Sequence, residues 1–401
     1  MRFVTTRIEC CKLLFRLGVK LSIMIRNSFF LLLLGFVWRC NLPLYAQFTL
    51  PEIALGAPVT YKNLQLYPVI ANITSSLGMA GKTGNYATLE ATMQNRLVQI
   101  AEQEPLPQTA VQLAMQNNYP IVPNQNRLIE KYEPVFEANT LDNADTNAIY
   151  SPFDNAILDP EIVRLSQLEA QTDRLFITNL SADTIYLIAG EVIKGGRQDR
   201  VIAQNMLLPP NTRYAALPVF CVEKNRWDYH HNQNPCFTGY SCIADATLRK
   251  TVQLNAQQED VWNVVNRTTA LQNSQTATQA YTALENNSAF IRLADAYVQF
   301  LQPILTGNKQ IVGVLAVTGN HIAGADIFAS NALFTSHVAN LLRSYAANAI
   351  INGSAPALAH NKVKEYWQQF FTPSGINRTA LFNKGKLFEN NGQIIHLTLF
   401  D

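Results

Sequence analysis

Four short apolar segments separated by turn residues lie between residues 174 and 223, and they constrain the fold more than any other feature of the sequence. The segments are Leu175–Asn179, Thr184–Ile193, Gln198–Met206 and Arg213–Glu223, and their connections contain Ser181-Ala182-Asp183, Gly195-Gly196 and Pro209-Pro210-Asn211. Short segments with such turns predict an antiparallel β meander. Because Thr184–Ile193 is apolar on both faces, we expect it to be a central strand covered on both sides.

Helical periodicity replaces the strand pattern after residue 241. Three helices are predicted, over Asp245–Thr269, Thr276–Leu301 and Asn331–Ile350. The remaining predicted elements are a strand over Tyr61–Ile70, a short helix over Thr88–Ala101, a hairpin of Gln310–Thr318 and His321–Phe328, a helix around Tyr366 and a last strand over Gln393–Phe400. Because strands, helices and strands follow one another in blocks, the sequence predicts an α+β fold rather than a series of βαβ units.

A single domain is expected over residues 61–350, with a C-terminal extension, residues 351–401, packed on it. Residues 104–126 are rich in Pro, Asn and Gln, and residues 139–159 form a second irregular segment. Segments of this composition and length are typical of surface loops, so both are interpreted as inserts in the domain.

Residues 1–46 have the features of a secretory signal. A basic stretch, Met24–Asn27, precedes the short apolar run Ser28–Trp38, and the small residue Ala46 follows. This arrangement predicts cleavage after Ala46, a mature chain that starts near Gln47, and export to the periplasm or the extracellular space. The alternative is that the apolar run stays uncleaved as an anchor; after signal removal no membrane span is expected.

The net charge of the mature chain argues against nucleic acid as a partner. The whole chain has 31 basic and 29 acidic residues, but residues 1–46 contain seven of the basic residues and one acidic residue. The remainder therefore has 24 basic and 28 acidic residues, a net charge of −4. A chain of this charge lacks the electrostatic footprint of a nucleic-acid-binding protein.

Three cysteines, Cys221, Cys236 and Cys242, remain after the signal is removed. In an oxidising compartment, Cys236 and Cys242 are plausible disulfide partners because they share one loop, which leaves Cys221 free. A metal site with His230 and His231 is the alternative, but the tight Cys-x-x-Cys pairs of structural zinc sites are absent, so no metal is predicted. No cofactor is predicted either, because the Walker-like segment at residues 76–83 has Ser76 in place of the first glycine.

Polar residues and glycines are densest in the segment from Gly190 to Arg200. On a continuous strand, Glu191 shares a face with Ile185, Leu187 and Ala189, and Glu223 shares a face with Leu217, Val219 and Cys221. Each carboxylate therefore ends an apolar row, where it loses hydration and needs a partner. Arginines offer a bidentate fork for this purpose.

We therefore expect both carboxylates to meet at one end of the sheet, in a pocket for a small polar ligand lined by Glu191, Gln198, Arg200, Glu223, Arg226 and Arg249. Two alternatives stay open. The cluster could be an internal staple of a structural or interaction module, or Glu191 or Glu223 could act as the general base of a hydrolase. Cys221 is interpreted as a small buried hydrophobic residue rather than a nucleophile.

These residues also resemble a family of largely uncharacterised bacterial proteins, the ARG- and rhodanese-phosphatase-superfamily-associated protein domain. The resemblance rests on the Gly-Glu strand end and Gly turn of GEVIKGGRQDR, on Cys221-Val222-Glu223 followed by Arg226-Trp227, and on Leu248-Arg249, Val261-Trp262 and Asp326-Ile327-Phe328 further on. It covers roughly residues 61–350 and leaves the segment after residue 350 outside. The resemblance points to Glu191, Gln198, Arg200, Cys221, Glu223, Arg226 and Trp227 as motif residues, and it implies no reaction.

Overall fold

The computed structural model describes residues 53–71, 86–102, 121–122, 127–128, 172–226, 237–372 and 375–401. The signal region 1–46 and the insert at 139–159 lie outside these ranges. So does the insert at 104–126, except for Ile121–Val122 (β6), which pairs with Arg127–Leu128 (β7). The predicted α+β class is confirmed, because the described residues combine antiparallel sheets with separate helices.

The largest sheet has seven strands, and its strands come from distant parts of the chain. They are β1 (Ile53–Leu55), β2 (Val59–Tyr61), β3 (Leu64–Ala71), β15 (Ile311–Thr318), β16 (His321–Phe328), β19 (Gly385–Asn390) and β20 (Gln393–Leu399). Their order is β1-β3-β15-β16-β20-β19, and β2 also pairs with β3. The predicted hairpin of β15 and β16 is present and turns at Gly319, whose φ is 56°.

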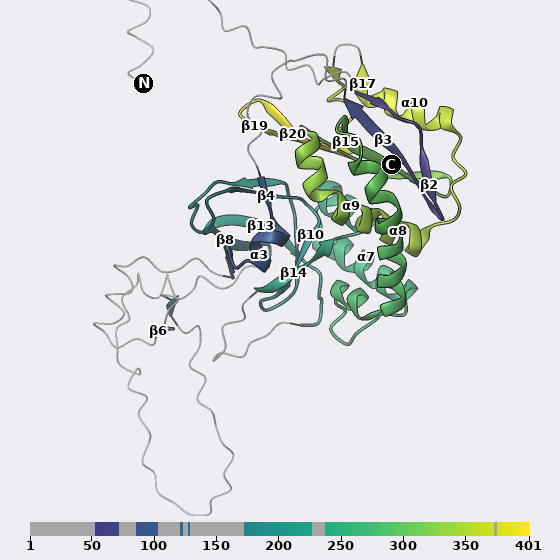
Figure 1. Ribbon diagram of the computed structural model, residues 1–401. Helices are drawn as coiled ribbons and strands as arrows, with labels where there is room; N and C mark the ends of the chain where they lie inside the picture. Colours follow the sequence, from purple (N-terminus) through teal and green to yellow (C-terminus); the bar gives the residue numbers. More distant parts are fainter. Residues whose placement is uncertain are drawn as a thin grey trace, which may run out of the picture. The chain divides into compact units, whose positions relative to one another are not determined.

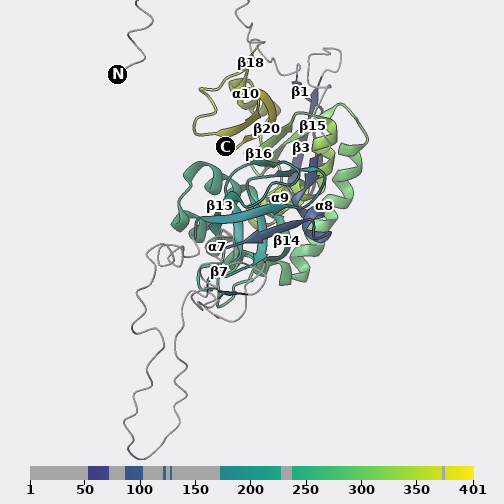
Figure 2. The same ribbon diagram turned by 90° about the vertical axis from the view of Figure 1, so that its left-hand side faces the viewer.

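Helices cover both faces of this sheet, so its central strands β3 and β15 are buried on both sides. Alternate residues of β3 and β15 pack on α8 (Ser288–Thr306) and α9 (Asn331–Asn352) on one face. The intervening residues of these strands point to the opposite face and pack on α10 (His360–Phe370), which contacts the sheet through Val363, Trp367 and Phe370. Figure 2 shows the sheet between α10 on one side and α8 and α9 on the other.

A second sheet, of six antiparallel strands, carries the polar segment around Gly195 (Figure 1). Its order is β14 (Phe237–Ile243), β10 (Glu191–Gly195), β11 (Arg200–Ile202), β13 (Ala215–Cys221), β8 (Arg174–Asn179) and β5 (Val98–Ala101). A three-stranded sheet of β12 (Met206–Leu208), β9 (Thr184–Leu187) and β4 (Tyr86–Thr88) shares a hydrophobic core with it. The short helix α3 (Leu89–Gln94) also packs into this core through Leu89.

The predicted strand Thr184–Ile193 is divided into β9 and β10, which belong to different sheets. The break lies at Gly190, whose φ of 100° is a conformation that favours glycine. The predicted strand Gln198–Met206 is divided in the same way into β11 and β12. The apolar pattern hides these breaks because buried residues lie on both sides of each of them.

The predicted helix Asp245–Thr269 consists of three pieces that cover the outer face of the six-stranded sheet. They are α6 (Ala246–Lys250), a π-helical turn (Thr251–Asn255) and α7 (Gln258–Leu271). The interruption is at Ala256, which has a left-handed conformation with φ of 53°. Val252, Val261 and Val265 from these pieces pack against Val192 and Val201 of the sheet.

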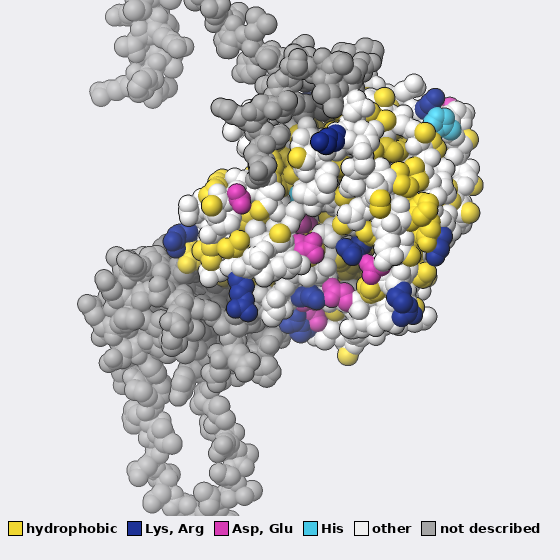
Figure 3. All heavy atoms as spheres, in the orientation of Figure 1, with side chains coloured by type: hydrophobic (Ala, Val, Ile, Leu, Met, Phe, Trp, Pro, Cys, Tyr) yellow, Lys and Arg dark blue, Asp and Glu magenta, His cyan; other side chains and the backbone are white. Residues whose placement is uncertain are grey.

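The segment after residue 350 contributes the last two strands, β20 and β19, at one edge of the large sheet. It had been expected to be an extension packed on the domain, but β20 forms hydrogen-bonded pairs with β16 from Ala325↔Leu399 to Phe328↔His396. Among the described residues, no helix is both long and apolar enough to cross a membrane. On the described surface, hydrophobic side chains gather over α8 and β2 (Figure 3).

Candidate functional site

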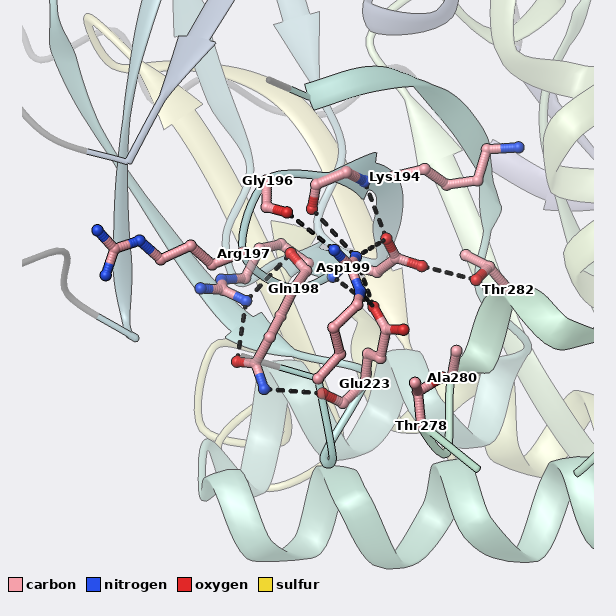
Figure 4. Close-up of polar contacts among 12 residues, drawn as sticks. Lys194, Gly196, Arg197, Gln198, Asp199, Glu223, Thr278, Ala280 and Thr282 are labelled. Atoms are coloured by element: carbon pink, nitrogen blue, oxygen red, sulfur yellow. Dashed lines mark hydrogen bonds and ion pairs between the residues drawn. The ribbon is translucent and has the colours of Figure 1, made fainter. Parts of the chain in front are cut away.

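Asp199, Glu223 and Arg226, here named the Arg226 cluster, meet at the turn between β10 and β11 (Figure 4). Arg226 Nε lies 2.7 Å and Nη2 lies 2.6 Å from Glu223 Oε2, and Nη2 is 3.0 Å from Asp199 Oδ1. The two carboxylate side chains are 6% and 8% exposed, whereas that of Arg226 is 29% exposed. One guanidinium at the edge of the protein therefore forms ion pairs with two nearly buried carboxylates.

Backbone groups and a hydroxyl complete the Arg226 cluster. Glu223 Oε2 also accepts a hydrogen bond from the Asp199 amide at 3.1 Å, and Asp199 accepts bonds from the Gly195 amide and from Thr282 Oγ1. Arg226 Nη1 donates to the Gly196 carbonyl at 2.9 Å. The cluster thus joins the glycine turn, the end of β13 and the segment before α8.

Burial raises the pKa of Asp199, although the hydrogen bonds from Thr282 and Gly195 and the charge of Arg226 oppose this effect. The charge of Glu223 adds to the increase.

Arg200 and Gln198 extend the Arg226 cluster into the interior of the six-stranded sheet. Arg200 Nη1 donates to the backbone carbonyl and to the side-chain oxygen of Gln198, whose Nε2 donates to the Glu223 carbonyl at 2.8 Å. Arg200 Nη2 lies 3.5 Å from Glu102 Oε2, and both side chains are buried. Sequence reasoning missed Glu102 as the carboxylate partner of Arg200 because it follows β5, far away in the chain.

Glu191 lies at the opposite end of β10 from the Arg226 cluster, so the expectation that Glu191 and Glu223 share guanidinium partners is wrong. In the sheet register Ile193 pairs with Arg200 and Val192 with Val201, which leaves Glu191 beyond them, next to Ile243 of β14. The five residues of β10 span about 13 Å at the usual rise per residue. The sequence predicts one continuous strand, Thr184–Ile193, with Glu191 near its end, but the break at Gly190 makes Glu191 the first residue of β10.

Arg249 was also expected beside Glu223, but it instead pairs with Asp326 in the interior. Its Nη1 and Nη2 lie 2.9 Å and 2.6 Å from the two carboxylate oxygens, and neither side chain is exposed. Tyr345 Oη donates to Asp326 Oδ2 at 2.6 Å, and His396 Nε2 lies 3.0 Å from Oδ1. We name Arg249, Asp326, Tyr345 and His396 the Asp326 cluster.

Tyr186 continues the Asp326 cluster towards the three-stranded sheet. Its hydroxyl lies 2.8 Å from His396 Nδ1, and Asn205 Nδ2 lies 3.3 Å from the same nitrogen. Burial lowers the pKa of His396, although Asp326 opposes this effect. The neutral ring therefore donates from Nε2 to Asp326 and accepts at Nδ1 from Tyr186.

The guanidinium of Arg249 and the hydrogen bond from His396 hold the pKa of Asp326 well below its usual range, against the effect of burial. Gly190 packs directly on this pair. A Cβ at residue 190 would lie 2.6 Å from Arg249 Cγ, in a backbone conformation that L residues rarely adopt. The Gly190-Glu191 motif therefore combines a glycine required by Arg249 with a carboxyl group close by.

Glu191 is the carboxyl group with the fewest partners among the predicted site residues. It is 1% exposed, its Oε2 accepts a hydrogen bond from the Ile188 amide at 2.8 Å, and the Tyr240 hydroxyl interacts with it more weakly. Burial raises its pKa to about 8; the Ile188 hydrogen bond opposes the shift, and the charge of Glu90 adds to it. Tyr240 and Arg249 lower this pKa by smaller amounts, although the Tyr240 hydroxyl is not placed for a regular hydrogen bond with any described residue.

The two described cysteines have the properties of buried thiols. Burial raises the pKa of Cys221 to about 11 and that of Cys242 to about 12, so neither is an activated nucleophile. Neither forms a disulfide with another described residue, and Cys236 lies outside the described residues, so the Cys236–Cys242 disulfide stays a prediction. Trp227, His230 and His231 are also outside. Within the described ranges no group of His, Cys, Asp and Glu is arranged to hold a metal ion.

The model of one protein family, the ARG and Rhodanese-Phosphatase-superfamily-associated Protein domain, matches residues 136–400. The match starts later than the expected residue 61 and continues through the C-terminal segment that had been expected to lie outside. Its end agrees with the structure, in which β20 lies inside the large sheet. Neither the curated proteins nor the solved structures contain a match to the chain.

Replacement of Arg226 by Ala leaves two nearly buried carboxylates without their shared cation, so we expect a loss of about 2–4 kcal/mol in the free energy of unfolding. The measurement is urea denaturation at pH 7. Lys362→Ala is the control, because it removes a surface ion pair with Glu365 and should cost less than about 1 kcal/mol. Equal effects of the two substitutions would contradict the structural role of Arg226.

Glu191→Gln should change how stability depends on pH. In the wild type, a folded pKa of about 8 against an ordinary value of 4.5 means that the folded state binds the extra proton between these values. Wild-type stability should therefore fall as the pH rises from 5 to 8, by about 3 kcal/mol more than in Glu191→Gln. Urea denaturation at several pH values measures this difference, with the exposed Glu365→Gln as a control that keeps the wild-type slope. Parallel pH curves for the wild type and Glu191→Gln would refute a protonated Glu191.

Proposed function

The chain belongs to the family of the ARG and Rhodanese-Phosphatase-superfamily-associated Protein domain, and we propose that it is an exported domain that binds a small polar ligand beside Glu191. The family description supplies no reaction, so the proposal rests on the geometry of the chain itself. Export rests on the sequence of residues 1–46.

The observation that carries the proposal is the contrast between the two glutamates. Glu223 Oε2 is fully engaged by Arg226 and the Asp199 amide. Glu191 is as deeply buried, but within the described residues it has one backbone donor and no ion pair. A buried carboxyl group that lacks a partner costs stability, and such costs are concentrated at functional sites.

Polar groups connect Glu191 with the surface. Glu90 of α3 is partly exposed, and its charge acts on Glu191. Glu90 Oε2 accepts a hydrogen bond from Asn340 Nδ2 of α9 at 2.8 Å. Tyr240, whose hydroxyl is buried without a regular partner in the described structure, also acts on Glu191. These groups extend the candidate site from the interior to the junction of α3 and α9.

The chemistry of these groups favours a ligand with hydroxyl or amino groups. At neutral pH a carboxyl group with a pKa of about 8 is mostly protonated and donates one hydrogen bond while accepting another. Glu90 offers a carboxylate, and Tyr240 offers a hydroxyl that either donates or accepts. Two carboxyl groups at one site disfavour an anionic ligand.

The alternatives considered for these residues receive less support. A protonated Glu191 is poorly suited to act as a general base at neutral pH, and the lone pairs of Glu223 Oε2 are occupied by Arg226 and the Asp199 amide. We therefore assign Glu223, Arg226, Gln198 and Arg200 a structural role. In this assignment, the staple and the ligand site both exist but occupy opposite ends of β10.

The ligand proposal is tested by thermal unfolding with a panel of monosaccharides, polyols, amino acids, polyamines and organic acids. At least one hydroxyl- or amino-containing compound should raise the melting temperature of the wild type and of Glu365→Gln, but not that of Glu191→Gln. A compound that stabilises Glu191→Gln as much as the wild type, or a wild type that responds only to organic acids, would contradict the proposed site.

Export is tested by expressing the full chain in a bacterium and sequencing the N-terminus of the protein recovered from the envelope or the medium. Cleavage after Ala46 should give a protein that starts at Gln47. Recovery of a protein that starts at Met1 or Met24 would contradict cleavage. A protein found only in the cytoplasm would contradict export.

A further inference from the structure

Helix α8 has an exposed apolar stripe next to its buried apolar face. Its inner face buries Phe290, Ala294, Tyr297, Val298, Leu301 and Leu305 in the protein core. Its outward face, here named the outer stripe, consists of Ala289, Leu293, Ala296, Phe300, Pro303 and Ile304. Leu293, Phe300 and Ile304 are 41%, 47% and 42% exposed. Polar side chains normally occupy the solvent-exposed positions of a surface helix, but at the outer stripe of α8 these positions are apolar.

The spacing of the outer stripe is that of a helix–helix contact. From Ala289 to Pro303 its residues follow one another at intervals of four, three, four and three positions. Such intervals repeat every seven residues and form a continuous seam along one side of a helix, into which the side chains of a second helix insert. The stripe therefore suits a helix rather than a strand or a flat surface.

Phe300 is held in place before any partner binds. Its ring stacks on that of Tyr61 with a centroid distance of 4.7 Å and an interplanar angle of 22°, and Tyr61 in turn contacts Tyr297 edge-on. An aromatic side chain fixed in this way loses little conformational entropy on binding. The stripe and the adjacent β2 form the hydrophobic area on the flank of α8 in Figure 3.

We propose that the outer stripe binds the same stripe of a second copy of this chain, with the two α8 helices antiparallel. The stripe is complementary to itself in this orientation, because a twofold axis beside Ala296 places Leu293 opposite Phe300 and Ala289 opposite Ile304. Leu293 then packs on Phe300, Ile304 faces the smaller Ala289, and the small side chain of Ala296 allows a close approach at the axis.

Charge and area are consistent with this pairing. The outer stripe has no charged residue, and the antiparallel arrangement places its flanking Arg292 beside Gln299 and Gln302 of the second copy rather than beside a second Arg292. The 19 residues of α8 span about 28 Å. With the edge of Tyr61 added, such a helix pair buries on the order of 1,000 Å², the lower bound for a specific interface.

Analytical ultracentrifugation over a range of concentrations tests whether the chain dimerises. The protein used is the full chain, in whichever processed form is recovered. The wild type should dimerise, and the double variant Leu293→Glu/Ile304→Glu should dissociate at least about 100-fold more readily. Phe382→Glu is the matched control, because Phe382 is 81% exposed outside the stripe, and this variant should remain dimeric. Thermal unfolding of each variant checks that the fold is kept.

Cysteine cross-linking tests the orientation and does not depend on destabilising substitutions. When Ala289→Cys and Ile304→Cys proteins are mixed and oxidised, a disulfide-linked heterodimer should form, since the antiparallel seam brings these two positions together. Ala296→Cys alone should form a homodimer. A monomeric wild type, a dimer that survives Leu293→Glu/Ile304→Glu, or a failure of the mixed cross-link would overturn the proposal.

Discussion

Asp326 is a carboxylate without contact with water, and the arrangement of the large sheet depends on how its charge is balanced. Arg249 meets it with both terminal nitrogens, and Tyr345 and His396 occupy its remaining positions. These four residues come from α6, β16, α9 and β20, so one buried ion joins four separate elements. An isolated buried ion pair often adds little net stability. Removal of one partner nevertheless strongly destabilises the fold, because it leaves the other charge buried and unpaired. The cluster therefore fixes which elements pack together more than it adds to the total free energy of folding.

In the Arg226 cluster, nearly buried carboxylates are also paired with an arginine, but this arginine is partly exposed. The Arg226 cluster holds two carboxylates with a cation from the protein edge, and it fixes the glycine turn of the six-stranded sheet. Between the two clusters lies Glu191, close enough to Arg249 for its charge to act, but without an ion pair in the described structure. The polar residues of this segment thus differ in how many ion-pair and hydrogen-bond partners they have. This difference separates the structural part of the motif from the part that we assign to ligand binding.

Much of the fold was predictable from the sequence, because burial leaves a periodic pattern. The hairpin of β15 and β16, the α+β class and the burial of Cys221 followed from that pattern. The breaks at Gly190 and Ala256 did not, since apolar residues continue on both sides of each. Ion-pair partners that lie far apart in the chain were also not predictable from the sequence. Arg200 pairs with Glu102 and Arg249 with Asp326, and only the Asp326-Ile327-Phe328 motif of the family resemblance pointed towards one of these carboxylates.

The pairing of β3 with β15 has a consequence for how the protein is made. More than two hundred residues separate these strands, so a growing chain presents β1, β2 and β3 long before their neighbour has been synthesised. During that time their edges are unpaired and apolar, which is the condition that promotes aggregation. The edge of β3 that pairs with β15 therefore stays open until residues 311–318 have been synthesised.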